Sequence, residues 1–222
     1  MEEHIVKVLK VENVTHNVRR FTLEKPDGYS FTPGQATEVS INDESLKNER
    51  RPFTFTSLNE WPTLEFTTKI YTDHHGVTEA LGKVKEGNEL LIHDVWGAIN
   101  YKGQGVFIAG GAGVTPFIAI FRQLQKDNKL EGNRLIFSNK TEKDIILKDE
   151  FSKMLGKNFY NTLTQEKSEK YGHRKIDKAF LKDQIKDFSQ NFYVCGPDQF
   201  VKDIINFLQE LGAKADAVVF EK

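Results

Sequence analysis

Cysteine is almost absent from this sequence, and its scarcity excludes two kinds of structure. The chain of 222 residues has one cysteine, Cys195, so no disulfide can form within it. One thiolate also excludes an iron–sulfur cluster held by four cysteines of this chain. Both exclusions suit a protein of the cytoplasm.

Long apolar runs are absent as well. No run approaches the ~20 residues that a helix needs to cross a bilayer. The opening stretch, MEEHIVKVLKVE, has no basic region followed by an apolar one, and so does not resemble a secretory signal. We therefore expect a cytoplasmic protein with no membrane span.

A charge excess of either sign is also missing. The net charge is −1, which gives no general attraction for nucleic acid or anionic membrane. Any phosphate-binding site must therefore be local. The hydrophobic fraction of 38% and the charged fraction of 28% are typical of a globular protein. At roughly 100–200 residues per domain, the length predicts one large or two modest domains.

The first hundred residues have the pattern of β-structure. Alternating apolar and polar residues predict strands within 4–15, 18–26, 32–42, 51–58, 63–71 and 88–96. The stretch 77–84 has room for only about two helical turns. Many short strands with one small helix predict an antiparallel barrel or sandwich.

From Gly103 onward, apolar strands alternate with stretches of helical spacing. This order predicts βαβ units and a parallel sheet, with a boundary near residues 100–104. In the last predicted helix, five residues share one face, as in a helix that covers a sheet: Phe200, Ile204, Phe207, Leu208 and Leu211.

Two turns follow predicted strands of the second half. In AGGAGVTP, residues 109–116, Gly110, Gly111 and Gly113 let the backbone approach a ligand, and we expect Thr115 to cap the next helix with Pro116 in its first turn. Such a helix start favours a phosphate, although a plain strand-to-helix turn has the same composition. In YVCGPDQF, Cys195-Gly196-Pro197 stands at the carboxyl end of a strand, where parallel sheets bind ligands.

Two motifs of the first half have competing interpretations. HHGVTEAL, residues 74–81, places Thr78 at a helix start that suits an anion or is a simple cap; adjacent histidines rarely share an ion, so we expect no metal site. RPFTFTSL, residues 51–58, puts a cation and several hydroxyls on one strand. It is either an ordinary half-buried strand or a surface for a flat, anionic ligand.

Taken in order, these motifs resemble those of the ferredoxin–NADP reductase superfamily of flavoproteins, over nearly the whole chain. RPFT resembles the flavin motif R-x-[YF]-[ST], with Ser57 in its extension. HGVT stands where the family has G-x-x-[ST], with His75 in the glycine position. GGAGVTP resembles the nucleotide loop G-G-[TA]-G-[IV]-[TA]-P, and CGP the second nicotinamide-side motif. The resemblance implies an FAD-binding β-barrel over residues 1–102 and an NAD(P)-binding α/β domain over residues 103–222.

The resemblance also implies roles for single residues. Arg51 would pair with the flavin phosphate, Phe53 would pack on the isoalloxazine ring, and Thr54 would hydrogen-bond near its N5 atom. Cys195 would lie beside the nicotinamide, and Glu221 resembles an acidic residue near the end of the family's last strand. The further residues that it assigns to cofactor binding are Pro52, Ser57, Lys69, Gly76, Val77, Thr78, Gly110, Gly111, Gly113, Thr115, Pro116, Ser138, Asn139, Lys140, Gly196 and Pro197.

The implied activity is transfer of hydride from NADPH or NADH to bound FAD, or less commonly FMN. Electrons would then pass to a separate carrier such as ferredoxin or flavodoxin, since no cluster domain is fused to this chain. The choice between NADPH and NADH stays open, because the lysines near Ser138 suit a 2′-phosphate while the motif N-K-T-x-x-D-I also resembles users of NADH. Two alternatives are a non-catalytic flavin relay subunit and a reductase of free flavin or quinone.

Overall fold

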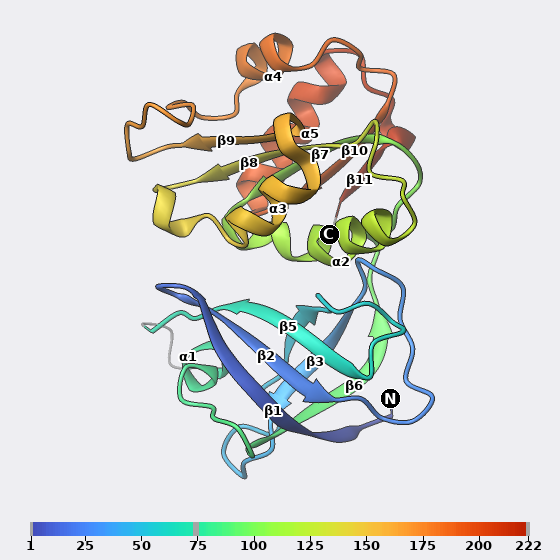
Figure 1. Cartoon of the computed structure of the whole chain (residues 1–222), viewed down its shortest axis with the longest axis vertical. Coiled ribbons are helices and arrows are strands. Elements are labelled where there is room, and N and C mark those ends of the chain that lie inside the picture. The colour runs from blue at the N-terminus through green and yellow to red at the C-terminus, as the bar shows by residue number, and fades with distance from the viewer. Residues whose placement is uncertain (1, 73–75, 221–222) are drawn as a thin grey trace.

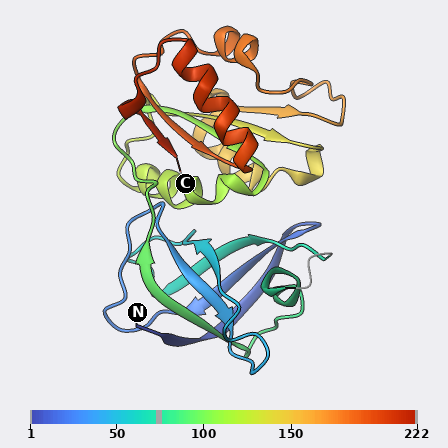
Figure 2. The ribbon, with the colours of Figure 1, turned by 180° about the vertical axis from the view of Figure 1, so that it is seen from behind.

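A computed structural model describes residues 2–72 and 76–220 of the chain. The structure has two lobes, one stacked on the other (Figure 1). The N-terminal lobe is built of strands, and the C-terminal lobe of strands covered by helices. Seen from behind, the chain passes from one lobe to the other in a single crossing after strand β6 (Figure 2).

The N-terminal lobe is one antiparallel sheet of six strands in the order β4-β3-β6-β1-β2-β5. A bridge between Phe55 and Phe66 brings the segment after β4 against β5, so the two edges of the sheet meet. The prediction of an N-terminal antiparallel β-barrel is confirmed. The elements are β1 (His4–Thr15), β2 (Val18–Glu24), β3 (Ala36–Ile41), β4 (Arg51–Thr54), β5 (Thr63–Lys69), α1 (Val77–Leu81) and β6 (Glu89–Trp96).

Alternation within these strands fills the barrel. Val6 and Val8 of β1, and Phe21 and Leu23 of β2, point inward and are at most 1% exposed. Their neighbours along each strand face outward. The period of two in the sequence is therefore the inside–outside alternation of the sheet.

The C-terminal lobe is a parallel sheet of five strands in the order β11-β10-β7-β8-β9. The predicted α/β parallel-sheet domain is confirmed. Its strands are β7 (Gly105–Gly110), β8 (Arg134–Asn139), β9 (Phe159–Leu163), β10 (Asn191–Cys195) and β11 (Val218–Phe220). Its α-helices are α2 (Thr115–Lys126), α3 (Lys148–Leu155), α4 (Lys178–Gln184) and α5 (Asp198–Glu210), with 3-10 turns η1 (Gly111–Val114), η2 (Glu142–Asp144), η3 (Gly156–Asn158) and η4 (Ala215–Ala217).

Each strand of this sheet is buried on both faces. In β7, Phe107 and Ala109 pack with α2 and α3, whereas Val106 and Ile108 pack with α4 and α5 on the other face. Of the predicted apolar face of α5, Ile204 and Leu208 are fully buried, and Phe200, Phe207 and Leu211 only partly. Coverage on both sides explains why these strands are continuous apolar runs.

The segment between β6 and β7, residues 97–104, is held by one tyrosine. The Tyr193 hydroxyl accepts hydrogen bonds from the N–H groups of Lys102 and Gly103, at 2.9 and 3.0 Å, and donates one to the Gly103 carbonyl at 2.7 Å. The predicted division between residues 102 and 103 falls in this segment and stays a prediction.

Helix α2 lies along the junction of the two lobes (Figure 1). Val18 of the barrel is 2% exposed and belongs to the hydrophobic core that α2 and α3 cover. Gly34 lies so close to the second lobe that a Cβ there would be 3.2 Å from Cδ1 of Ile120. Apolar packing therefore continues from one lobe into the other.

Candidate functional site

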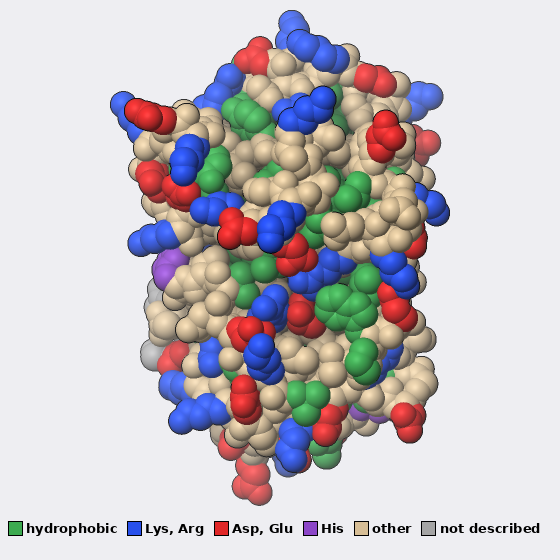
Figure 3. Space-filling model, viewed as in Figure 1, with side chains coloured by type: hydrophobic (Ala, Val, Ile, Leu, Met, Phe, Trp, Pro, Cys, Tyr) green, Lys and Arg blue, Asp and Glu red, His purple; other side chains and the backbone are tan. Residues whose placement is uncertain are grey.

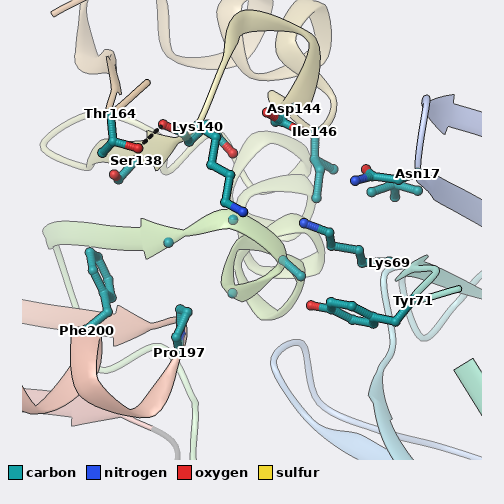
Figure 4. A pocket seen from close by; sticks show the side chains of 17 residues that line it. Asn17, Lys69, Tyr71, Ser138, Lys140, Asp144, Ile146, Thr164, Pro197 and Phe200 are labelled. Carbon is teal, nitrogen blue, oxygen red and sulfur yellow. Dashed lines mark hydrogen bonds between the residues drawn. The ribbon is translucent and has the colours of Figure 1, made fainter. Parts of the chain in front are cut away.

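A cavity of about 510 Å³ lies between the barrel and the carboxyl edge of the parallel sheet. This volume is in the range of small-molecule sites, about 300–1,000 Å³. Figure 4 shows side chains from both lobes directed into it. Its lining residues are Asn17, Val18, Lys69, Tyr71, Gly110, Gly111, Ala112, Gly113, Ser138, Asn139, Lys140, Asp144, Ile146, Thr164, Gly196, Pro197 and Phe200.

The two glycine-containing turns predicted separately from the sequence touch each other at this cavity. A Cβ on Gly113 would lie 2.4 Å from both the Cys195 carbonyl oxygen and the Gly196 nitrogen. Only glycine fits there, because the backbones themselves are in contact. The sequence motifs thus form one wall, with Gly110, Gly111, Gly113, Gly196 and Pro197 all lining it.

Phe200 completes this wall and was missed from the sequence. A Cβ on Gly196 would lie 2.7 Å from Cδ1 of Phe200, and one on Gly110 would lie 3.2 Å from it. The ring therefore covers both glycines. The sequence pattern predicts Phe200 on the apolar face of a helix, and only the packing shows that the same ring also faces the cavity.

The start of α2 differs from the prediction. Thr115 does not cap the helix: the N-cap is Val114, and no side chain bonds to the free N–H groups. Helical backbone already begins at Gly111, with the 3-10 turn η1. The Thr115 hydroxyl therefore donates to the Ala112 carbonyl of that turn, at 3.0 Å. Pro116 is in the first turn, as predicted. Neither Thr115 nor Pro116 lines the cavity, which is bounded by residues 110–113 of this turn.

The end of β8 supplies the most unusual polar group. Asn139 is 4% exposed, yet neither atom of its side-chain amide has a hydrogen-bond partner among the described residues. Buried amides are normally paired, so the unpaired amide of Asn139 is a candidate contact for a molecule in the cavity that it lines. Ser138 and Lys140 flank it, and the Thr164 hydroxyl donates to the Asn139 carbonyl at 3.3 Å.

Two lysines enter the cavity from opposite lobes. Figure 4 shows Lys69 of β5 and Lys140 after β8 directing their side chains into the same space. Neither ammonium forms an ion pair within residues 2–72 and 76–220, and Lys69 Nζ lies 5.6 Å from the ring centroid of Tyr71. The carboxylate of Asp144 is engaged elsewhere, since it accepts from the Thr141 N–H at 3.0 Å and lies 3.5 Å from His16. The cavity therefore has an excess of positive charge that suits an anion.

The predicted flavin strand lies on the barrel but outside the lining of this cavity. Arg51 and Pro52 are exposed, and Phe53 and Thr54 are half-buried. Arg51 Nη1 donates to the Arg50 carbonyl at 2.7 Å, and its Nη2 lies 3.9 Å from Glu49, so most of its donors face outward. Phe53 packs against the barrel core, 6.2 Å from Phe66 between ring centroids.

The Ser57 hydroxyl forms a hydrogen bond inside the barrel and is not exposed to a ligand. The Ser57 side chain is 0% exposed, and its hydroxyl accepts the Glu65 N–H at 3.0 Å. Its predicted contact with a cofactor stays a prediction. The alternation of hydroxyls in 51–58 therefore serves two environments, because Thr54 is accessible while Thr56 and Ser57 are buried between strands.

The remaining predicted residues have different surroundings. Gly76 is the N-cap of α1, Thr78 is half-buried in its first turn, and the Val77 side chain is buried in the barrel core. Cys195 is 9% exposed and packs in the core under α2, next to lining residues Gly196 and Pro197. Glu221, and the histidines 74 and 75, lie outside the described residues.

Three further features of the described chain concern metal binding, membrane spans and surface charge. Within residues 2–72 and 76–220, His, Cys, Asp and Glu side chains form no group of three or more that could hold a metal ion. In the same residues, no helix has the length and apolar character to cross a bilayer. Acidic and basic side chains are interspersed over the face in Figure 3, as the net charge of −1 leads one to expect.

Comparisons with known proteins agree with this arrangement. Residues 107–205 match the family model of the oxidoreductase NAD-binding domain. NADH-cytochrome b5 reductase 2 of Aspergillus niger is 27% identical over 218 residues, which cover 90% of this chain and 67% of that protein. The reductase component of propane 2-monooxygenase from Rhodococcus jostii is 23% identical over 235 residues, which cover 97% of this chain and 62% of that protein. This chain thus spans about two thirds of the length of these relatives.

A solved structure matches the fold over both lobes. The ferredoxin NADP+ reductase of Neisseria gonorrhoeae, described with bound FAD and NADP, superposes with a TM-score of 0.87 at 20% identity, covering 100% of this chain and 98% of that one. The chain therefore has the two-lobed fold of this ferredoxin NADP+ reductase, as the order of its motifs predicted, and residues 107–205 match the oxidoreductase NAD-binding domain.

Proposed function

We propose that the chain is a flavin-dependent NAD(P)H oxidoreductase that passes electrons to a separate redox partner. The observation that carries the proposal is the cavity between the lobes, lined by the barrel on one side and by both glycine turns on the other. The nicotinamide nucleotide would bind in this cavity, and the flavin would bind at strand β4, which lies on the barrel outside the cavity lining. The rate of hydride transfer would then depend on how the two cofactors are aligned.

The nucleotide lobe has groups that fit NADPH or NADH. Three glycines of the first turn, at positions 110, 111 and 113, line the cavity without side chains. Lys69 and Lys140 bring two ammonium groups for a diphosphate. The unpaired amide of Asn139 can donate and accept, as a ribose hydroxyl or an adenine edge requires. The relatives named as NADH-dependent favour NADH, while Lys140 equally suits a 2′-phosphate.

The barrel has groups that fit FAD. Arg51 presents a forked guanidinium at the surface, and Phe53 and Thr54 follow it at strand spacing, half-buried and accessible. The Thr54 hydroxyl forms no hydrogen bond within the described residues, so it is available to a ring nitrogen. FAD, when bound, accepts two electrons from a nicotinamide and releases them one at a time. The protein's part is to hold, align and shield the two cofactors.

The electron acceptor is proposed to be a protein carrier. Ferredoxin and flavodoxin are the acceptors expected from the sequence, and the names of the relatives add cytochrome b5 and oxygenase components. A relay subunit that never binds a nicotinamide would not need the backbone contact between Gly113 and Cys195 or the unpaired Asn139. These features favour an enzyme over the relay.

One experiment tests the proposal. The protein is purified without added cofactor, its visible absorbance is recorded after gel filtration, and NADH and NADPH are added in turn without oxygen. We expect a retained flavin, identified as FAD after release, that is bleached by at least one donor. Protein that is colourless and takes up neither FAD nor FMN, or flavin that neither donor bleaches, would contradict the proposal.

The acceptor is identified in the same preparation. Ferredoxin, flavodoxin, cytochrome b5 and free FMN are each offered to the reduced protein, and reoxidation is followed without oxygen. We expect a protein carrier to reoxidise it faster than free FMN does. A flavin that leaves the protein on gel filtration and a preference for free FMN would instead support the free-flavin reductase.

A further inference from the structure

Arg122 is a buried cation that none of the proposed cofactor contacts uses. It lies on α2, in the nucleotide lobe, yet its guanidinium enters the barrel and is 9% exposed. Its Nη1 donates to the backbone carbonyl of Thr56 at 2.6 Å and to Glu65 Oε1 at 2.6 Å. One side chain therefore joins a helix of one lobe to the backbone at Thr56 and to the Glu65 carboxylate of β5 in the other.

The rest of the guanidinium is held equally closely. Its Nε and Nη2 donate to the two carboxylate oxygens of Glu150, at 2.6 and 3.0 Å, and its Cζ lies 5.3 Å from the ring centroid of Trp61. The Thr56 hydroxyl in turn donates to Glu65 Oε1 at 2.7 Å. A planar group bonded on two edges and stacked on a ring has one orientation only.

The charge at this position is permanent. Burial by itself would lower the pKa of Arg122, but the hydrogen bonds that it donates to Glu150 and the negative charge of Glu65 outweigh burial, so the pKa is raised. A buried ion pair gives little net stability compared with apolar packing of the same shape. The ion pairs of Arg122 instead fix how the groups around the guanidinium are arranged.

The position of Arg122 links the two halves of the candidate site. Helix α2 begins where the glycine turn 111–114 ends, and Arg122 lies about two helical turns further on. Thr56 comes two residues after Thr54 on the predicted flavin strand. We propose that Arg122 is a positioning residue that fixes the glycine turn relative to the flavin strand, and thereby the alignment of nicotinamide and flavin. This inference rests on the proposed function.

The test compares three changes with a matched control. Arg122→Met removes the cation, and Arg122→Lys keeps the charge but loses the fork. Because Arg122→Met leaves two carboxylates buried without their partner, a triple variant with Glu65→Gln and Glu150→Gln removes that penalty. The control is Lys126→Met: Lys126 lies one turn further along α2 and reaches Glu60 of the barrel at 2.5 Å, but both side chains are exposed.

The first readout is rapid anaerobic reduction of the flavin by NADH or NADPH. At saturating donor, we expect Arg122→Met and the triple variant to reduce about 10- to 100-fold more slowly, as for a misalignment near 1 Å. Flavin content and the donor's Kd should change less than about 3-fold, Arg122→Lys should be intermediate, and Lys126→Met should match the native protein. The proposal would be overturned if Arg122→Met and the triple variant both reduced at the native rate. It would also be overturned if only flavin content or donor affinity decreased.

The second readout does not depend on activity. Hydrogen exchange of backbone amides is measured on each variant as purified. In Arg122→Met and in the triple variant, we expect faster exchange in residues 54–58 and 110–115 together. In Lys126→Met, we expect faster exchange in neither segment. Faster exchange in one segment alone would overturn the coupling. If the native protein carried no flavin, the proposed function would fail, while this comparison would still decide whether Arg122 couples the two segments.

Discussion

Arg51 stands at the head of β4 with half of its side chain exposed. Its nearest carboxylate, on Glu49, is 3.9 Å away, a distance at which an exposed pair contributes little. Apart from the hydrogen bond that Nη1 donates to the Arg50 carbonyl, the guanidinium makes no hydrogen bond within the described residues, and a phosphate would be a better partner than Glu49. The role implied by resemblance is consistent with this position.

Arg51→Ala is expected to weaken flavin retention. A hydrogen bond to a charged group contributes about 1.5–3 kcal/mol, so flavin affinity should fall roughly tenfold or more. The measurement is the flavin content after gel filtration, with the free energy of unfolding as a check. Arg50→Ala is the control, since Arg50 is the adjacent cation and lies 3.9 Å from Glu3. Equal flavin content in both variants would refute the role of Arg51.

Cys195→Ser tests whether the thiol acts in the reaction. Cys195 packs in the core beside two lining residues, so the small change from sulfur to oxygen should leave the fold and the flavin in place. We expect bleaching of the flavin by the donor to slow by roughly tenfold, because the nicotinamide would be aligned less well. The rate is measured at saturating donor without oxygen. A rate equal to that of the native protein would remove Cys195 from the mechanism.

At the scale of elements, the site depends on how two turns meet. The turn after β7 and the turn after β10 belong to neighbouring strands, since Cys195 is paired with Ala109 in the parallel register. Parallel strands end at one edge, so their turns must share the space above it. Gly113 allows the two turns to share this space because it has no side chain.

Gly113→Ala should separate these turns. The added Cβ would lie 2.4 Å from two backbone atoms that have no room to move away. We expect a loss of about 1–3 kcal/mol in the free energy of unfolding, together with weaker donor binding. Both are measured by denaturant unfolding and by donor titration.

Gly156→Ala is the control for this change. It places a methyl group in open space, at a residue with φ of 52° outside the candidate site. It should cost about 1–2 kcal/mol through backbone strain and leave donor binding unchanged. Donor binding that falls equally in both variants would show that the contact at Gly113 has no special part in the site.

The connection between the lobes depends on Tyr193 of β10. Burial raises the pKa of this tyrosine, so its hydroxyl stays protonated and can donate to Gly103 while it accepts from two N–H groups. Tyr193→Phe should lower the free energy of unfolding by about 1–3 kcal/mol, because buried backbone groups lose their partner. Tyr101→Phe should cost less, since the Tyr101 hydroxyl is 3.4 Å from Asn133. Equal losses would contradict the proposed importance of the Tyr193 contact.

At the scale of the whole molecule, the lobes should behave as one folding unit. Val18 of the barrel belongs to the core of the other lobe, and the hydrogen bonds from Arg122 to Thr56 and Glu65 cross the same junction. Both tryptophans of the chain, Trp61 and Trp96, come from the N-terminal half, whereas α2 to α5 lie in the C-terminal half. Fluorescence and helical circular dichroism therefore report on different lobes.

We expect these two signals to change together during denaturant unfolding. A shared buried interface makes separate unfolding costly, so the midpoints should coincide within error. The control is Arg122→Lys, which weakens the junction and should lower both midpoints equally. Two well-separated midpoints in the native protein would show that the lobes unfold independently.

Patterns of neighbouring residues predict the order of the two architectures and the position of the main turns. Alternation of period two in the first half and apolar runs with helical spacing in the second half are properties of neighbouring residues, and they predicted both sheets. The glycines at 110, 111, 113 and 196 were found for the same reason, since a requirement for bare backbone is visible in the residue itself. The order of these motifs predicted the two-lobed reductase fold, and the solved structure of a ferredoxin NADP+ reductase agrees with it.

Only the tertiary structure decided which distant residues meet. Lys69 and Lys140 come to one cavity, Asn139 is buried without a partner, and Arg122 bonds to a carbonyl 66 residues earlier in the chain. Ser57 and Thr115, which local pattern treats as available hydroxyls, are used inside the fold. The contacts of Ser57 and Thr115 depend on packing within one lobe, whereas those of Lys69, Lys140 and Arg122 depend on how the two lobes dock. No pattern of neighbouring residues encodes the docking of the lobes.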